Sequence, residues 1–129
     1  MSGANGQDRK KILLVDDSPS TLMMERMVLQ REPFDLVTAN SGEEAVEKAM
    51  AERPDLVLLD VVMPGINGFE VCRRLREHED TRGVPIIMVT TRGESQNMES
   101  GFAAGCTDYV TKPINSLELM TKVKTHLKG

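Results

Sequence analysis

Carboxylate, hydroxyl and amine side chains stand directly after short apolar runs of this sequence. Asp60 closes the run Asp55–Asp60, whose four consecutive apolar residues predict a strand buried on both faces. A carboxylate in such a place, beside other polar groups, can act as a nucleophile and form an acyl phosphate. The residues at the ends of the apolar runs are Asp16, Asp17, Asp60, Thr90 and Lys112.

The three aspartates predict a metal site if the fold brings them together. Crowded carboxylates repel one another, and a cation among them removes the repulsion. Oxygen ligands without His or Cys favour a hard ion, and Mg²⁺ is expected because it binds through a few carboxylates plus phosphate oxygens and water. Lys112 would then donate to one oxygen of a phosphoryl group on Asp60, and Thr90 to another.

Each of these residues also has a plainer interpretation when it is taken alone. Asp16 and Asp17 precede Ser18-Pro19, where they suit turn and cap chemistry. Asp60 at the end of a strand could simply cap the following segment, and Lys112 before a proline could be a solvent-exposed charge on a loop. The functional interpretation therefore depends on whether the strand ends meet.

The apolar runs and helix signals predict five strands that alternate with five helices. Strands joined through helices are parallel, and a parallel sheet carries helices on both faces. Because the carboxyl ends of parallel strands lie at one edge, the polar residues converge there. The expected strands are 10–15, 34–39, 55–60, 84–89 and 106–110, and the expected helices are 19–31, 41–53, 68–78, 92–105 and 115–128.

Length and composition bound the class of protein. The 129 residues suit one domain, and 40% apolar with 28% charged residues is ordinary globular composition. The net charge of −4 disfavours direct binding to nucleic acid. No apolar run approaches the roughly 20 residues of a membrane span. Residues 1–9 lack the apolar stretch of a signal peptide, so we expect a disordered lead and a cytoplasmic protein.

Cysteine, histidine and methionine give weaker signals. Cys72 and Cys106 form either one disulfide or two buried thiols, and a cytosolic chain favours the thiols. His78 and His126 are expected to be exposed on helices or helix ends. Nine methionines against one tyrosine and three phenylalanines predict a core of thioethers and aliphatics. The core stripe expected for the last helix is Leu117, Met120, Val123 and Leu127.

In motif order and spacing, the chain resembles the receiver domain of two-component response regulators, and in particular the single-domain chemotaxis regulators, over residues 10–128. The resemblance implies a flavodoxin-like parallel sheet with strand order 2-1-3-4-5. It implies a phosphorylation-switched signalling module, not an enzyme that acts on metabolites, with a sensor histidine kinase or phosphotransfer protein as phosphodonor. It rests on Leu14–Asp17, on Asp60 with Met63-Pro64-Gly65 and Gly68, on Thr90, and on Lys112-Pro113.

The same resemblance implies a role for each residue of the site. Asp60 would be the phosphoacceptor. Mg²⁺ would bind Asp17, Asp60 and the backbone carbonyl of Val62, and Asp16 would contribute through water. Lys112 would bind a phosphoryl oxygen.

A switch pair is also implied by the resemblance. On phosphorylation Thr90 would move toward the phosphate, and Tyr109 would turn inward into the space that Thr90 leaves. The helix expected at 92–105 has few core residues and an internal glycine, and mobile functional elements come from such weakly anchored segments. Its face, together with the last strand and residues 112–128, is therefore the expected output surface for a downstream protein.

Three neighbours of the site depart from the commonest pattern of the family. Thr91 is β-branched where a smaller residue is usual beside the phosphate. Val62 and Arg92 occupy positions that tune hydrolysis of the acyl phosphate in the family. Because an apolar Val62 cannot orient an attacking water, we expect slow autodephosphorylation.

Three other interpretations stay open. The chain could be a receiver cut from a longer regulator with a DNA-binding or catalytic domain, although the Met1 start and the end at Gly129 without a linker favour a stand-alone module. A phosphatase of the haloacid dehalogenase type also uses an aspartate nucleophile with Mg²⁺, but Val61-Val62 after Asp60 break its Asp-x-Asp motif. A degenerate receiver that signals without phosphate is disfavoured because the site residues are all present.

Overall fold

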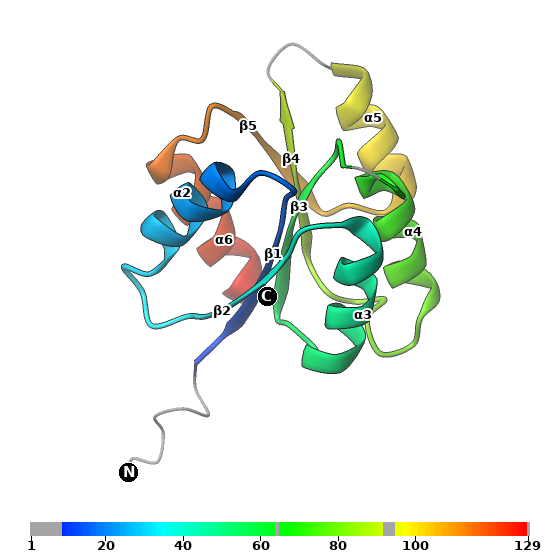
Figure 1. The fold of residues 1–129 in the computed structure, drawn as a ribbon, viewed down its shortest axis with the longest axis horizontal. Coiled ribbons are helices and arrows are strands. Elements are labelled where there is room, and N and C mark those ends of the chain that lie inside the picture. The colour runs from blue at the N-terminus through cyan, green and yellow to red at the C-terminus, as the bar shows by residue number, and fades with distance from the viewer. Residues whose placement is uncertain (1–8, 64, 92–94, 129) are drawn as a thin grey trace.

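A five-stranded parallel sheet runs through the described residues of the computed structural model, which are 9–63, 65–91 and 95–128. The strand order is β2-β1-β3-β4-β5, and a helix follows each strand (Figure 1). The predicted fold class and strand order are therefore confirmed. The elements are β1 (Lys11–Val15), α2 (Pro19–Leu29), β2 (Asp35–Ala39), α3 (Gly42–Glu52), β3 (Leu56–Asp60), α4 (Gly68–Glu77), β4 (Ile86–Thr91), α5 (Ser95–Ala104), β5 (Asp108–Lys112) and α6 (Ser116–Lys128).

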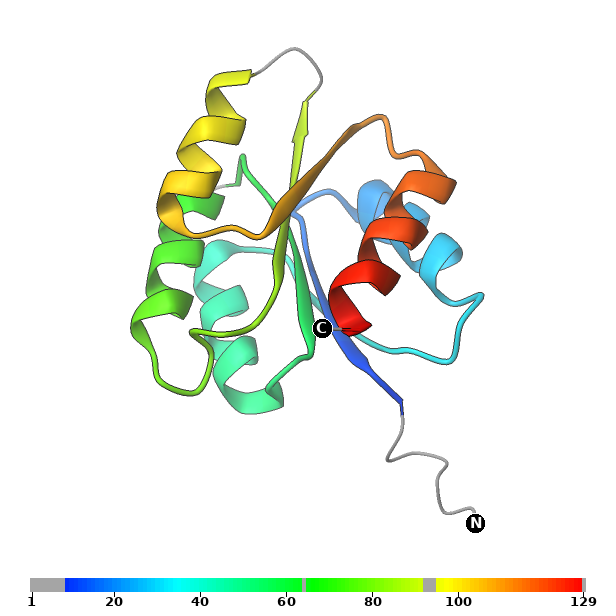
Figure 2. The same cartoon turned by 180° about the vertical axis from the view of Figure 1, so that it is seen from behind.

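Helices cover both faces of the sheet. Helices α2 and α6 lie on one face, and α3, α4 and α5 lie on the other (Figures 1 and 2). Each face has its own apolar core, with Leu14 and Leu58 in one and Leu13 and Leu59 in the other. Because successive side chains of a strand point to opposite faces, a central strand needs an unbroken apolar run. Every residue of β3 is accordingly buried.

Side-chain caps begin α3 and α6 where the sequence predicts them. The Ser41 hydroxyl accepts from the Glu44 amide at 3.1 Å, and the Asn115 side chain accepts from the Glu118 amide at 2.9 Å. The Glu44 carboxylate accepts from the Asn40 amide at 2.8 Å, one residue before the cap that a capping box would use. These caps satisfy amides that the first helical turn leaves unpaired.

Two predictions about α6 are wrong. Leu117, predicted in the core stripe, is 77% exposed, and Leu119 is fully buried instead. Each helical residue turns by about 100°, so the stripe through Leu119 and Val123 points Leu117 toward solvent. His126, predicted to be exposed, is partly buried, with its Nε2 2.9 Å from Asp108 Oδ2. It is paired because α6 packs along β5.

The predicted methionine-rich core is wrong as well. Met23, Met24 and Met27 of α2 are 63%, 48% and 61% exposed. Among the methionines whose burial the structure describes, only Met63 and Met88 are buried. The core is instead mostly leucine, isoleucine and valine.

The remaining predictions concern the cysteines, α5 and the membrane. Cys72 and Cys106 are two buried free thiols, as predicted. Gly101, expected only to weaken its helix, is a packing residue, because a Cβ there would lie 3.1 Å from the Cys106 Sγ. Within the described ranges, no helix is long and apolar enough to cross a bilayer. Of the predicted lead at 1–9, residues 1–8 lie outside the described residues, as do Pro64 and Arg92, whereas Arg9 is described and pairs with Asp35 at 3.1 Å.

Candidate functional site

The polar residues at the strand ends line one cavity, as the sequence predicts. The carboxyl ends of β1, β3, β4 and β5 point to the same edge of the sheet (Figure 1). Thr91 is in register with Lys112, so β4 and β5 end level, and Asp60 is in register with Val89, so β3 ends two residues before them. The cavity has a volume of about 260 Å³ and is lined by Asp16, Asp17, Ser18, Asp60, Val61, Val62, Thr90, Thr91 and Lys112.

Gly68 allows α4 to begin directly against the end of β3. Its amide donates to the Val61 carbonyl at 2.9 Å. A Cβ at this position would lie 2.5 Å from the carbonyl oxygen of Asp60, closer than a side-chain carbon can approach. Glycine is therefore required where the chain turns back after the acidic residue.

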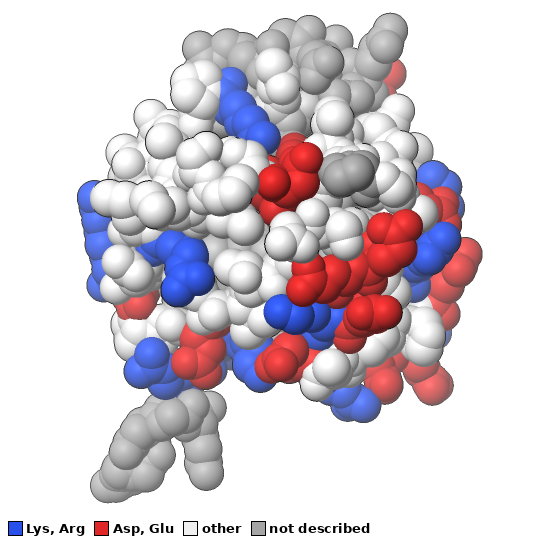
Figure 3. All heavy atoms as spheres, in the orientation of Figure 1, with Lys and Arg blue, Asp and Glu red and all other residues white. Residues whose placement is uncertain are grey.

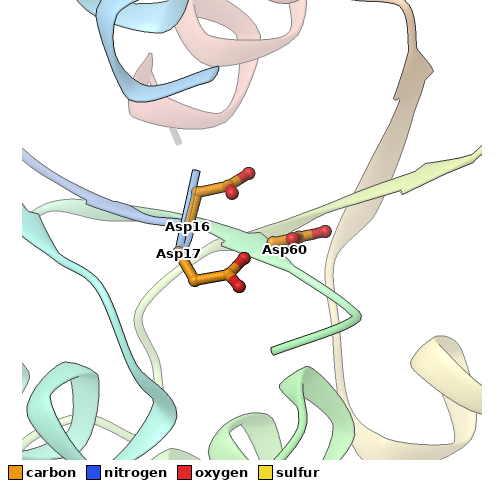
Figure 4. A group of neighbouring side chains, drawn as sticks. All are labelled: Asp16, Asp17 and Asp60. Atoms are coloured by element: carbon orange, nitrogen blue, oxygen red, sulfur yellow. The ribbon is translucent and has the colours of Figure 1, made fainter. Parts of the chain in front are cut away.

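Asp16, Asp17 and Asp60 form an acidic cluster. One carboxylate oxygen from each lies within 4.8 Å of the others. Figure 4 shows the three carboxylates pointing to the same side, two from the end of β1 and one from the end of β3. Asp16 and Asp60 are buried, and Asp17 is exposed. The space-filling view shows a small group of acidic side chains near the middle of the face toward the viewer (Figure 3).

Lys112 brings the opposite charge to the acidic cluster. Its Nζ lies 3.4 Å from Asp16 Oδ2 and 3.5 Å from Asp60 Oδ1. Burial and the neighbouring Asp16 raise the pKa of Asp60 to about 6, although Lys112 and the Val62 amide act against the rise. Burial alone would lower the pKa of Lys112, but the two carboxylates raise it above its ordinary value. The site thus holds a firmly charged ammonium beside an aspartate that binds protons unusually well.

The acidic cluster fits a hard divalent cation. Its donors are all oxygens, which Mg²⁺ prefers. The Oδ1 atom of Asp16 accepts from the Ser18 amide at 2.8 Å, whereas its buried Oδ2 has the ion pair with Lys112 but no hydrogen-bond partner among the described residues. An added positive charge would interact with this oxygen and relieve the repulsion that raises the pKa of Asp60.

The predicted switch residues lie on neighbouring strands. Thr90 is buried and lines the cavity. Tyr109 on β5 is partly buried, and its ring meets the Phe102 ring edge-on, with centroids 6.2 Å apart. The Nζ of Lys122 lies 4.8 Å from the centroid of the same tyrosine ring.

Glu25 is a buried carboxyl group near the site that the sequence analysis missed. It is 1% exposed on α2, and neither carboxyl oxygen has a hydrogen-bond partner among the described residues. Burial, followed by the charge of Asp16, raises its pKa to about 8, even though Lys112 lowers it. Its spacing relative to the buried Leu29, one helical turn later, was a usable signal: an acid stands on the apolar stripe of α2.

Comparison with known proteins places this geometry in a family. The family model described as "Response regulator receiver domain" matches residues 12–124. The transcriptional regulatory protein ResD of Bacillus subtilis is 44% identical over 118 residues, which are 92% of this chain and 48% of ResD. The chain thus spans about half the length of the curated relatives that it matches.

Solved structures agree with this comparison. A putative response regulator from Chloroflexus aurantiacus is 36% identical with a TM-score of 0.91, covering 94% of this chain and 99% of that one. The chemotaxis regulator CheY4 of Vibrio cholerae is 34% identical with a TM-score of 0.86, covering 92% and 98%.

A third structure is informative about the metal. The receiver domain of the sensor histidine kinase PA1611 from Pseudomonas aeruginosa is 29% identical with a TM-score of 0.87, covering 94% of this chain and 99% of that one. That structure has a magnesium ion coordinated in its active-site cleft. From the family match, the shared fold and the clustered strand ends, we conclude that this chain belongs to the receiver domains of two-component response regulators, which signal through phosphorylation.

Proposed function

We propose that Asp60 is the phosphoacceptor of this receiver domain. The observation that carries the proposal is the cavity in which the Asp60 carboxylate lies beside Lys112, Asp16 and Asp17. A carboxylate oxygen of Asp60 attacks the phosphorus of a phosphohistidine on a sensor kinase or phosphotransfer protein. The new P–O bond forms as the P–N bond breaks, and the leaving imidazole takes up a proton.

The residues around Asp60 stabilise the transferred group. Lys112 is close enough to Asp60 Oδ1, at 3.5 Å, to donate to a phosphoryl oxygen and offset its charge. The Thr90 hydroxyl lines the same cavity and donates to another oxygen. Asp17, Asp60 and the backbone carbonyl of Val62 would hold Mg²⁺, with Asp16 acting through water. When bound, this ion supplies positive charge to the phosphoryl oxygens.

Phosphorylation would change the surface on the far side of Thr90. Thr90 moves toward the phosphoryl group, and the Tyr109 ring turns inward. The surface formed by α5, β5 and α6 then binds a downstream protein. The chain acts in this proposal as a cytoplasmic signalling module that phosphorylates itself, and it turns over no metabolite.

Two kinds of output are supported by different relatives. The full coverage of CheY4 favours a stand-alone module of the chemotaxis type. The half coverage of ResD favours the receiver part of a longer transcriptional regulator, in which another domain would bind DNA. In both cases the net charge of −4 disfavours direct nucleic-acid contact by this chain. The length of the full gene product separates the two.

The acyl phosphate is proposed to be long-lived. Val62 is 68% exposed at the rim of the cavity, and an apolar side chain there cannot orient a water toward the phosphorus. Thr91 lines the cavity as well, and its branched side chain narrows access. A lifetime of only seconds would contradict this part of the proposal.

Incubation with acetyl phosphate and Mg²⁺, followed by intact mass measurement, tests the proposal. One added phosphoryl mass is expected for the wild type and none for Asp60→Ala. The matched variant Asp80→Ala makes the same change at an exposed loop residue and should be labelled like the wild type. Absence of label in the wild type, or equal labelling of Asp60→Ala, would refute the assignment.

A further inference from the structure

Lys122 of α6 is bound to β5 more tightly than a surface lysine usually is. Its Nζ donates to the Tyr109 carbonyl at 2.6 Å and lies 3.6 Å from Asp108 Oδ1. It also lies 3.2 Å from Glu118 Oε2 on its own helix. The side chain is 26% exposed. One hydrogen bond to a backbone carbonyl and two ion pairs therefore hold the ammonium in one place.

The ammonium held in this way lies against the ring of Tyr109. The distance from Nζ to the ring centroid is 4.8 Å, inside the range of a cation–π attraction. The Phe102 ring of α5 meets the same tyrosine at an interplanar angle of 83°. Such edge-on contacts are favourable for aromatic pairs. Tyr109 is thus contacted by one side chain from α5 and one from α6.

We propose that Lys122 is a positioning residue that holds the Tyr109 ring in the orientation seen in this structure, between Lys122 and Phe102. The inference rests on the proposed switch role of Tyr109. A ring that turns inward must leave an ammonium that Asp108, Glu118 and the backbone keep in place. The cation–π contact therefore opposes the turn, and phosphorylation has to overcome it.

The size of this effect follows from the exposure of the pair. A cation–π contact at a partly exposed site is weak, so its removal should raise the ratio of inward to outward rings about two- to fivefold. By linkage, a phosphoryl analogue that favours the inward ring should bind tighter by up to the same factor. A lysine that only ties α6 to β5 would change stability without changing either quantity.

A graded set of variants separates the charge from the hydrogen bond. Lys122→Arg keeps a cation that can lie over the ring and should behave like the wild type. Lys122→Gln keeps a donor for the Tyr109 carbonyl but loses the charge, and Lys122→Met loses both. Lys124→Met is the matched control, because Lys124 lies on the same helix but pairs with Glu32, at 2.9 Å.

The single tyrosine of the chain makes the ring directly observable. The sequence has one tyrosine and no tryptophan, so tyrosine labelled with ¹³C in the ring reports Tyr109 alone. NMR spectra of the 129-residue chain and of each variant are recorded with Mg²⁺, before and during titration with beryllofluoride as the phosphoryl analogue. The Tyr109 resonance of the unliganded protein lies between the positions of a fully outward and a fully inward ring, and its place between them gives the fraction of inward rings. The titration gives the affinity for beryllofluoride.

The expected result is a free resonance shifted toward the bound position, with two- to fivefold tighter beryllofluoride binding, in Lys122→Gln and Lys122→Met only. A wild-type resonance that moves while both variants bind and respond like the wild type would overturn the role of Lys122 and leave the switch intact. A Tyr109 resonance that does not respond to beryllofluoride in the wild type would refute the proposed switch itself. It would also refute the role of Lys122, which rests on that switch.

Discussion

Replacement of Glu25 by glutamine should make the free energy of unfolding less sensitive to rising pH. Glutamine has nearly the same shape as glutamate but does not titrate. Burial, followed by Asp16, raises the pKa of Glu25 from 4.5 to about 8 in the folded chain. Between these two values the folded state holds a proton that the unfolded state has lost. The stability of the wild type therefore falls as pH rises through this interval. Glu25→Gln does not show this fall, because the glutamine does not titrate.

The magnitude follows from the size of the shift. Each pH unit inside the interval costs about 1.4 kcal/mol, and an interval from 4.5 to about 8 gives a total on the order of 5 kcal/mol. The free energy of unfolding of Glu25→Gln, minus that of the wild type, should thus grow by about 1.4 kcal/mol per unit from about pH 5 to 7.5. Above about pH 8 the difference should level off because Glu25 is then ionised in both states.

Urea denaturation at a series of pH values and constant ionic strength measures this difference. Wild type, Glu25→Gln and the control Glu47→Gln are compared, since Glu47 lies on the exposed side of α3. The control shows the pH dependence that the rest of the chain contributes. Unfolding free energies of wild type and Glu25→Gln that run parallel from pH 5 to 8 would refute the assignment of Glu25 as a protonated buried acid.

Three further predictions concern the metal and the phosphate. Asp17→Asn should weaken Mg²⁺ binding by about 100-fold and abolish Mg²⁺-dependent labelling by acetyl phosphate; unchanged affinity in a metal titration would contradict the ligand assignment. Mg²⁺ affinity should fall about tenfold per unit below pH 6, because the pKa of Asp60 is raised to about 6 and protons then compete with the ion; a flat affinity between pH 5 and 7 would count against this. Val62→Asn should shorten the life of the acyl phosphate about fivefold, since one oriented water is worth about one hydrogen bond, and a hydrolysis time course that matches the wild type would remove Val62 from the explanation.

The strand ends were predictable because they depend on a simple rule of topology. Runs such as Leu56–Asp60 are readable as buried strands, and parallel strands end at the same edge. Asp60 and Lys112 therefore come together in space although 51 positions separate them along the chain. The type and order of the residues at the strand ends were enough to predict which side chains meet in one cavity.

Side-chain environments were less predictable, because they depend on how each helix is rotated about its axis. The core stripe predicted for the last helix included Leu117, and the number of methionines predicted thioethers in the core, whereas the helices turn other residues inward. Glu25 occupies an inward position of α2, which its spacing to Leu29 indicates although composition does not. The contacts of Lys122 with β5 require tertiary packing and have no local sequence signal.

Chemical identification of the phosphorylated residue tests the central claim most directly. Borohydride reduces the acyl phosphate of an aspartate to homoserine, which marks the acceptor permanently. After labelling with acetyl phosphate and Mg²⁺, reduction and peptide sequencing by mass spectrometry, we predict homoserine at position 60 and at no other aspartate. Homoserine at position 16 or 17, or a phosphate that resists reduction on a hydroxyl residue such as Thr90, would contradict the account.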